Sequence, residues 1–226
     1  MNEDGMLFQW IEWYSTHMDP GKTRRQIAAE ATQQAIVRAA SRLFLEHGYH
    51  STSIGAVARE AGVAVQTIYN AVGSKRDLLS RVLDFAAAGE RAPTPVPTFM
   101  TEQAEREPDP RLVIDQLVEF WRGGLARTAP VFRVIRQAAA IDPEVAELER
   151  QRAEQRLRNY GSAARILDER GALRPGLSRD DAAAAIFAIG NPDIYRFFVS
   201  EEGWEPQRWA EWVRGRLYAA LLPDPS

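Results

Sequence analysis

The sequence contains no cysteine and only three histidines among its 226 residues. The lack of cysteine excludes disulfide bonds and thiolate metal sites and fits a reducing compartment, so we expect a cytoplasmic protein. With so few histidines we predict neither a bound metal nor a cofactor. The chain also lacks a phosphate-binding glycine loop, a nucleophile elbow and a metalloprotease motif, and we therefore do not expect an enzyme.

No apolar run is long enough to cross a bilayer. The nearest, "MLFQWIEWYSTHM" (residues 6–18), is short, contains Glu12 and follows acidic residues, which excludes a signal peptide and a membrane anchor. We treat residues 1–18 as a leader and expect that deleting residues 1–17 leaves the fold and its function intact. The alternative is an amphipathic helix that docks on the body of the protein.

Alternation of apolar and polar residues, the mark of a β-strand, is missing over any useful length, so the sequence predicts an all-α fold. In the N-terminal half we expect a helix over residues 25–46 that ends at Gly48. A second helix should begin at Thr52 or Ser53 and run to residue 60. A third should span residues 64–71, and Ser74 should cap a fourth, with Asp77 at its third position.

Five prolines and a glycine interrupt residues 86–110, which we interpret as a linker. Beyond it, helices are expected over 110–127, 130–141, 143–171, 178–200 (kinked at Asn191-Pro192) and 205–222. The predicted organisation is therefore a leader (1–18), an N-terminal domain (19–85), a linker (86–110) and a larger helical domain (111–226).

The formal net charge of −3 conceals an uneven distribution. Residues 19–85 carry nine Lys and Arg against six Asp and Glu, whereas the rest of the chain is acidic. A basic N-terminal domain on an acidic body suits nucleic-acid binding. In the long segment 143–171, Glu and Arg alternate, and we expect these charges to pair along a solvated helix face.

The stretch "AGVAVQTIYNAVGSK" (residues 61–75) predicts a helix-turn-helix. Gly62 suits the turn, and Ala58 and Ala61 are small enough for two helices to cross closely. The third helix then exposes Gln66 and Asn70, whose amides can bind adenine edges. The other residues of this helix that we predict to contact DNA are Val65, Thr67 and Tyr69. Lys75, at the start of the next helix, should bind a phosphate of the DNA backbone.

From "AIVRAASRLF" to "GSKRDLLSRVL" the sequence resembles the DNA-binding domain of the TetR (tetracycline-repressor-like) family. The shared sequence motifs include Gly48-Tyr49, Thr67-Ile68-Tyr69 and Ser74-Lys75. The resemblance also places Thr52 and Ser53 among the DNA-binding residues. One departure stands after Tyr69, where Ala71 and Val72 replace the family's aromatic residue and Phe.

The resemblance implies that residues 111–226 form a helical effector-binding and dimerisation domain. As candidates for an apolar ligand site we take Trp121, Phe132 and Tyr160, with Arg136 as the anchor for an anionic ligand. Each aromatic residue could equally be plain core. Apolar stripes on the last two helices predict a homodimer interface. Its candidate residues are Ile186, Ile189, Phe197, Trp209, Trp212, Val213, Arg216 and Leu217.

Together these features predict a homodimeric transcriptional regulator, a repressor, that binds a near-palindromic DNA operator and is released by a small-molecule effector. The alternative is a helical adaptor that binds protein and has neither DNA nor ligand function. That alternative leaves the basic charge of the N-terminal domain unexplained.

Overall fold

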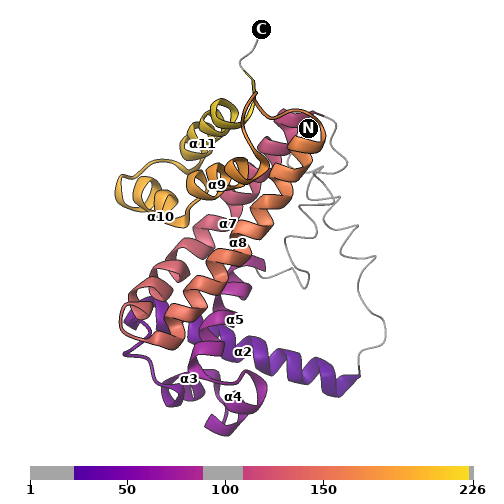
Figure 1. The fold of residues 1–226 in the computed structure, drawn as a ribbon. Helices are drawn as coiled ribbons and strands as arrows, with labels where there is room; N and C mark the ends of the chain where they lie inside the picture. Colours follow the sequence, from indigo (N-terminus) through magenta and orange to yellow (C-terminus); the bar gives the residue numbers. More distant parts are fainter. Residues whose placement is uncertain (1–22, 89–108, 224–226) are drawn as a thin grey trace.

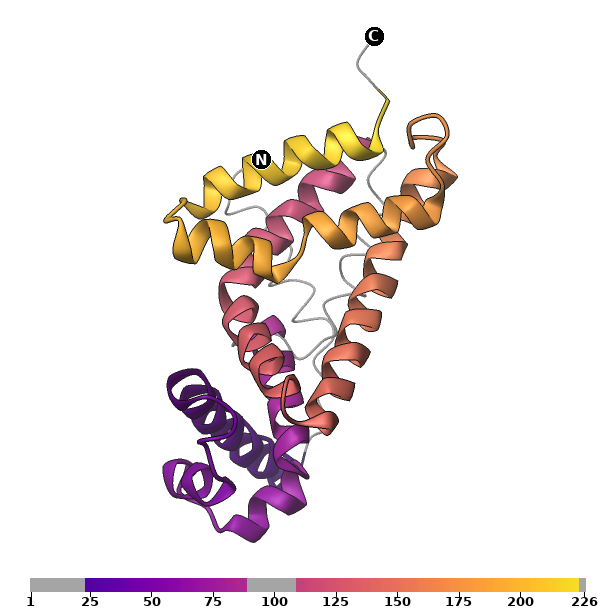
Figure 2. The same ribbon diagram turned by 60° about the vertical axis from the view of Figure 1, so that its left-hand side comes forward.

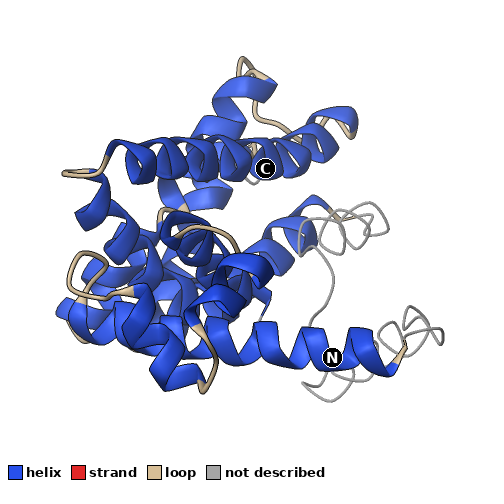
Figure 3. Ribbon diagram, turned by 90° about the horizontal axis from the view of Figure 1, so that it is seen from below, coloured by secondary structure: helices blue, strands red, loops and turns tan. Residues whose placement is uncertain are grey.

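The computed structural model of the chain describes residues 23–88 and 109–223. Within these two ranges every regular element is a helix (Figure 3), as the sequence predicted. The expected leader, and residues 89–108 of the expected linker, lie outside the described residues. None of the described helices is both long and apolar enough to cross a membrane.

The N-terminal helices follow the sequence prediction within one or two residues. They are α2 (Arg24–His47), α3 (Ile54–Ala61), α4 (Val65–Ala71) and α5 (Lys75–Ala88). The hydroxyl of Ser53 accepts the backbone N–H of Ala56 at 3.1 Å and begins α3. Ser74 and Asp77 bond each other's backbone N–H groups at the start of α5. Each such cap stabilises its helix by about 1 kcal/mol, which explains why these boundaries can be read from the sequence.

The helix α7 (Pro110–Ala139) is continuous over 30 residues. The sequence prediction of two helices divided at Pro130 was therefore wrong. An internal proline removes one backbone hydrogen bond and crowds the preceding turn, at a cost of about 3 kcal/mol. Burial on both sides offsets this cost, since Ala129 and Val131 are 3% and 1% exposed. Tertiary packing, which local sequence does not reveal, keeps the helix intact.

The remaining elements are α8 (Pro143–Glu169), α9 (Arg179–Ile189), α10 (Pro192–Tyr195), the π-helix η1 (Arg196–Glu201) and α11 (Pro206–Leu221). The sequence predicted one kinked helix over residues 178–200, and the structure divides it into three elements. Asn191 ends the first of them, because its side chain accepts the backbone N–H of Asp193 at 2.9 Å and starts α10. The expected kink is thus a full break.

Two hydrophobic cores are arranged along α7. From Val113 to Ala129 its buried side chains pack with α8, α9 and α11, whereas from Val131 to Ala138 they pack with α2–α5 and the start of α8. The N-terminal helices lie together at one end of the molecule (Figure 1). From there α7 and α8 diverge, and α9 and α11 lie across their far ends (Figure 2). One long helix therefore connects the N-terminal core to the body.

Candidate functional site

A helix-turn-helix is formed by α3 and α4. Gly62 ends α3 with φ of 68°, in the left-handed region that favours glycine. Ala58 and Ile68, which are 3% and 0% exposed, fill the space between the two helices. Val72, at the position where the resembled family has Phe, is also buried in this core. The packing fixes the angle of α4 and leaves its opposite face free.

The free face of α4 carries most of the predicted DNA-binding residues. Gln66 and Asn70 are exposed, as are Val65 and Tyr69, while Thr67 is partly buried. The Nε2 atom of Gln66 donates to Oδ1 of Asn70 at 3.0 Å. This bond holds the two amides side by side and leaves a carbonyl oxygen on Gln66 and an NH₂ group on Asn70. An acceptor beside a donor complements the N6 and N7 edge of adenine in the major groove.

Thr52 does not belong to this surface. Its side chain is buried at 2% exposure, and its hydroxyl is directed to the backbone carbonyls of Gly48 at 2.9 Å and Leu43 at 3.1 Å. The sequence prediction of a DNA contact is thereby corrected: Thr52 joins the end of α2 to the start of α3. Ser53 is exposed, and its hydroxyl caps the N-terminus of α3.

Lys75 lies in the first turn of α5, next to the end of α4. Its side chain is partly buried, and its ammonium lies 4.3 Å from the ring centroid of Tyr49. Desolvation by burial lowers the pKa of Lys75. The ring holds the cation at a defined place, which suits the predicted phosphate contact.

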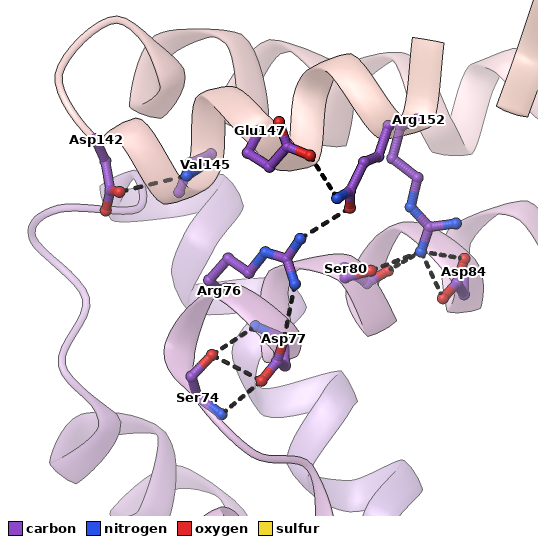
Figure 4. A network of polar contacts seen from close by, with 10 residues as sticks. Ser74, Arg76, Asp77, Ser80, Asp84, Asp142, Val145, Glu147 and Arg152 are labelled. Atoms are coloured by element: carbon purple, nitrogen blue, oxygen red, sulfur yellow. Dashed lines mark hydrogen bonds and ion pairs between the residues drawn. The ribbon is translucent and has the colours of Figure 1, made fainter. Parts of the chain in front are cut away.

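A polar network joins the N-terminal helices to the body (Figure 4). Arg152 of α8 donates to the hydroxyl of Ser80 at 2.6 Å and to Asp84 at 2.8 Å, both on α5. One turn nearer the start of α5, Arg76 donates to Gln151 at 2.9 Å. Through these contacts a displacement of α8 would act directly on α5.

The structure brings the three aromatic candidates of the ligand site into one cluster in the body. Trp121 of α7 contacts Tyr160 of α8 edge to face, with 5.2 Å between ring centroids. Tyr160 lies 6.3 Å from Phe187 of α9. Arg156 of α8 completes the chain of contacts, since its guanidinium carbon lies 4.7 Å from the Phe187 ring and 4.9 Å from the Phe132 ring. We call these five residues the aromatic–arginine cluster.

Arg136, the anchor predicted from the sequence, has other partners. Its guanidinium is paired with Glu149 at 3.3 Å and with Asp193, and its side chain is 59% exposed. Arg156 is the arginine inside the cluster, and the sequence prediction missed it together with Phe187. A signal was present: Arg156 has Arg, Ala, Asn and Tyr three and four residues away, with no acidic partner on its own helix face.

Trp121 is closely packed against Gly190, where a Cβ atom would lie 2.4 Å from the indole ring. Gly190→Ala is therefore expected to displace the indole and to lower the free energy of unfolding by about 1–3 kcal/mol. Urea denaturation followed by circular dichroism measures this. The matched control is Gly161→Ala in α8, where a Cβ meets nothing within 4 Å. It should be neutral or stabilising by up to about 1 kcal/mol, and equal losses in both variants would contradict the packing.

The structure divides the eight residues predicted for the dimer interface. Four of them, Ile186, Trp209, Val213 and Leu217, are 0% exposed within a single chain. They are core residues with no surface to offer a partner, which corrects the sequence prediction. The other four, Ile189, Phe197, Trp212 and Arg216, retain exposed surface. Periodicity identified the apolar stripe but not whether it faces the chain's own core.

Comparison with known proteins connects this geometry to a family. Residues 36–82 match the sequence profile described as "Bacterial regulatory proteins, tetR family". This segment contains the helix-turn-helix and the parts of α2 and α5 that pack against it. Among curated proteins, no sequence matches the chain.

Several solved structures share the fold over most of the chain. NalD from Pseudomonas aeruginosa, described as the secondary repressor of the MexAB-OprM multidrug efflux pump, is 24% identical with a TM-score of 0.69, covering 87% of this chain and 99% of that chain. SmeT in complex with triclosan is 20% identical with a TM-score of 0.64, covering 86% and 93%. A TetR family transcriptional regulator from Pseudomonas syringae pv. tomato is 19% identical with a TM-score of 0.61, covering 85% and 97%.

At these identities the solved structures establish the fold, and the profile match assigns the helix-turn-helix. The matched family consists of regulatory proteins. The profile match therefore assigns residues 36–82, which contain α3 and α4, to the tetR family of bacterial regulatory proteins, and the chain as a whole shares the fold of the solved structures.

Proposed function

We propose that the protein is a homodimeric transcriptional repressor, which binds a near-palindromic operator through α4 and releases it when a small molecule binds the body. The observation that carries the proposal is the exposed pair of hydrogen-bonded amides, Gln66 and Asn70, on the free face of α4. A rigidly packed helix with such a face is suited to the major groove, and two copies related by a twofold axis read a palindrome. We place both operator binding and its release by the small molecule in the cytoplasm.

The related structures support the finer parts of this proposal. NalD is described as a repressor, and SmeT is solved with triclosan bound. Both are properties of those proteins, and we extend to this chain the two roles they illustrate, repression and small-molecule binding. We assign the N-terminal role to residues 19–85, and the effector and dimer roles to residues 111–226.

The dimer surface is proposed on the outer faces of α9 and α11. Exposed small residues recur there four apart, Ala184 and Ala188 on α9 and Gly215 and Ala219 on α11. Small side chains let the helices of a partner approach closely, and Trp212 at the edge supplies apolar area. Two of the exposed residues from the sequence prediction, Trp212 and Arg216, lie on α11 with Gly215 and Ala219.

Effector and operator are proposed to communicate through α8. Arg156 in the aromatic–arginine cluster and Arg152 in the junction with α5 are four residues apart, so they lie on the same face of the helix. A ligand that shifts this part of α8 would move α5 and change the spacing of the two α4 helices. A ligand that binds more tightly to the dimer with the wrong α4 spacing lowers the affinity for the operator. The bound operator lowers the affinity for the ligand by the same factor.

Selection of binding sites from random DNA duplexes tests the proposal. The purified full-length chain is expected to enrich one near-palindromic sequence, with affinity that falls steeply as salt increases. The adaptor alternative predicts no enrichment at any salt concentration, low salt included. That result would overturn the proposed function.

A further inference from the structure

We infer that the effector is an organic acid with a planar aromatic body, whose acid group pairs with the Arg156 guanidinium and whose body contacts Phe187, the partly buried ring that packs on the core residues Tyr160 and Trp121. The inference rests on the proposed function, because it names the ligand class of the proposed effector site. It also replaces Arg136, the anchor predicted from the sequence, by a different residue.

Arg156 differs from the other arginines that bridge helices of the body. Arg214 binds Asp115 at 2.8 Å and Glu119 at 3.1 Å, and Arg152 binds Asp84. Arg156 has no ion pair with any residue in the described ranges, and its Nε–H is fully buried without a hydrogen-bond partner there. Its close neighbours in the cluster are the rings of Phe132 and Phe187, which offer no lone pair. The Nε–H of this cation therefore has no hydrogen-bond partner among the described residues.

The nearest carboxylates do not supply the missing partner. Asp193 and Glu149 are close enough to influence the charge of Arg156, but both are bound to Arg136 at the exposed edge. Burial lowers the pKa of Arg156, which shows that its charge is poorly solvated. A guanidinium held between two rings, with a buried N–H and no ion pair among the described residues, is stabilised when a ligand supplies a carboxylate with matching bidentate geometry.

The surroundings of Arg156 define the rest of the ligand. Phe187, Tyr160 and Trp121 follow one another at ring-centroid distances of 6.3 Å and 5.2 Å, and they come from three different helices. Aromatic rings prefer other aromatic rings, edge to face or offset, so a planar body is favoured over a flexible alkyl chain. Burial raises the pKa of Tyr160 to about 12, so its hydroxyl stays protonated and can donate to the acid group.

The test compares a matched pair of probes, 2-naphthoate and its neutral isostere 2-naphthamide, by isothermal titration calorimetry on the full-length protein. We expect 2-naphthoate to bind the wild type and 2-naphthamide to bind at least about 30-fold more weakly, since a buried charged hydrogen bond is lost. Arg156→Met should remove this preference. Arg158→Met, at an exposed position on the same helix, should retain it.

Thermal unfolding without ligand separates a binding role from a structural one. Arg156→Met removes a poorly solvated charge, so its Tm should equal that of the wild type or exceed it by a few degrees. A fall of more than about 5 °C would assign Arg156 to the stability of the fold and would overturn the inference. Absence of 2-naphthoate binding, or equal binding of both probes, would also overturn it.

The two proposals fail separately. If the protein binds 2-naphthoate but enriches no DNA sequence, the proposed repressor function would be wrong and the inferred ligand class would remain supported. If the protein enriches an operator sequence but does not bind 2-naphthoate, the inferred ligand class would be wrong and the repressor function would remain supported.

Discussion

Replacing both Gly215 and Ala219 by glutamate is expected to yield a folded monomer that binds its operator at least about 100-fold more weakly than the wild type. Both positions are exposed on α11, and a Cβ added at Gly215 meets nothing within 4 Å in the chain. Glutamate also has a higher helix propensity than glycine, so the single chain should not lose stability. In the proposed dimer, however, four carboxylates would meet across the twofold axis.

Sedimentation equilibrium and thermal unfolding measure this prediction together. The double variant should sediment as a monomer and retain its helical circular dichroism signal. Ala126→Glu, a small residue exposed in the middle of α7, is the matched control and should remain dimeric. A double variant that stays dimeric with unchanged operator affinity would place the interface elsewhere.

The second large effect is expected on α4. Gln66→Ala and Asn70→Ala should each lower affinity for the selected operator by about 5- to 150-fold, because a bidentate amide–base contact is worth about 1–3 kcal/mol. The two effects should be non-additive, since one amide orients the other through their 3.0 Å hydrogen bond. The loss should disappear on operators in which the contacted base pair is replaced.

Lys75→Ala is the contrasting variant in the same assay. A phosphate contact carries no sequence information, so this variant should weaken binding to all sequences alike and reduce the salt slope by about one unit. If Lys75→Ala changed the preferred base and the amide variants did not, the assignment of α4 to the major groove would be wrong.

The N-terminal helices could be predicted from sequence because their boundaries are set by neighbouring residues. Ser53 and Ser74 cap helices through bonds to groups three residues away, and Gly62 supplies the positive φ between α3 and α4. The resemblance to a known family added the role of α4. Thr52 was misassigned because the same hydroxyl suits a phosphate contact or a backbone bond, and only the packed turn decides between them.

The larger domain could be predicted in outline, but its details depend on contacts between distant segments. Pro130 stays inside a helix because two cores bury the residues around it. Trp209 has the periodicity of an interface residue, yet it packs edge to face on Tyr195, with ring centroids 4.9 Å apart, inside one chain. Arg156 lies in a run of alternating charges, and its sequence neighbours do not separate it from arginines that pair within the helix, as Arg150 does with Glu147 and Glu154.

Hydroxyl-radical footprinting of the wild-type protein on its selected operator tests the central claim most directly, namely that two α4 helices of a dimer enter successive major grooves. The account predicts two equivalent protected half-sites whose centres are about 34 Å, or one helical turn, apart. A single protected half-site at concentrations where the protein is dimeric, or uniform protection without half-sites, would contradict it.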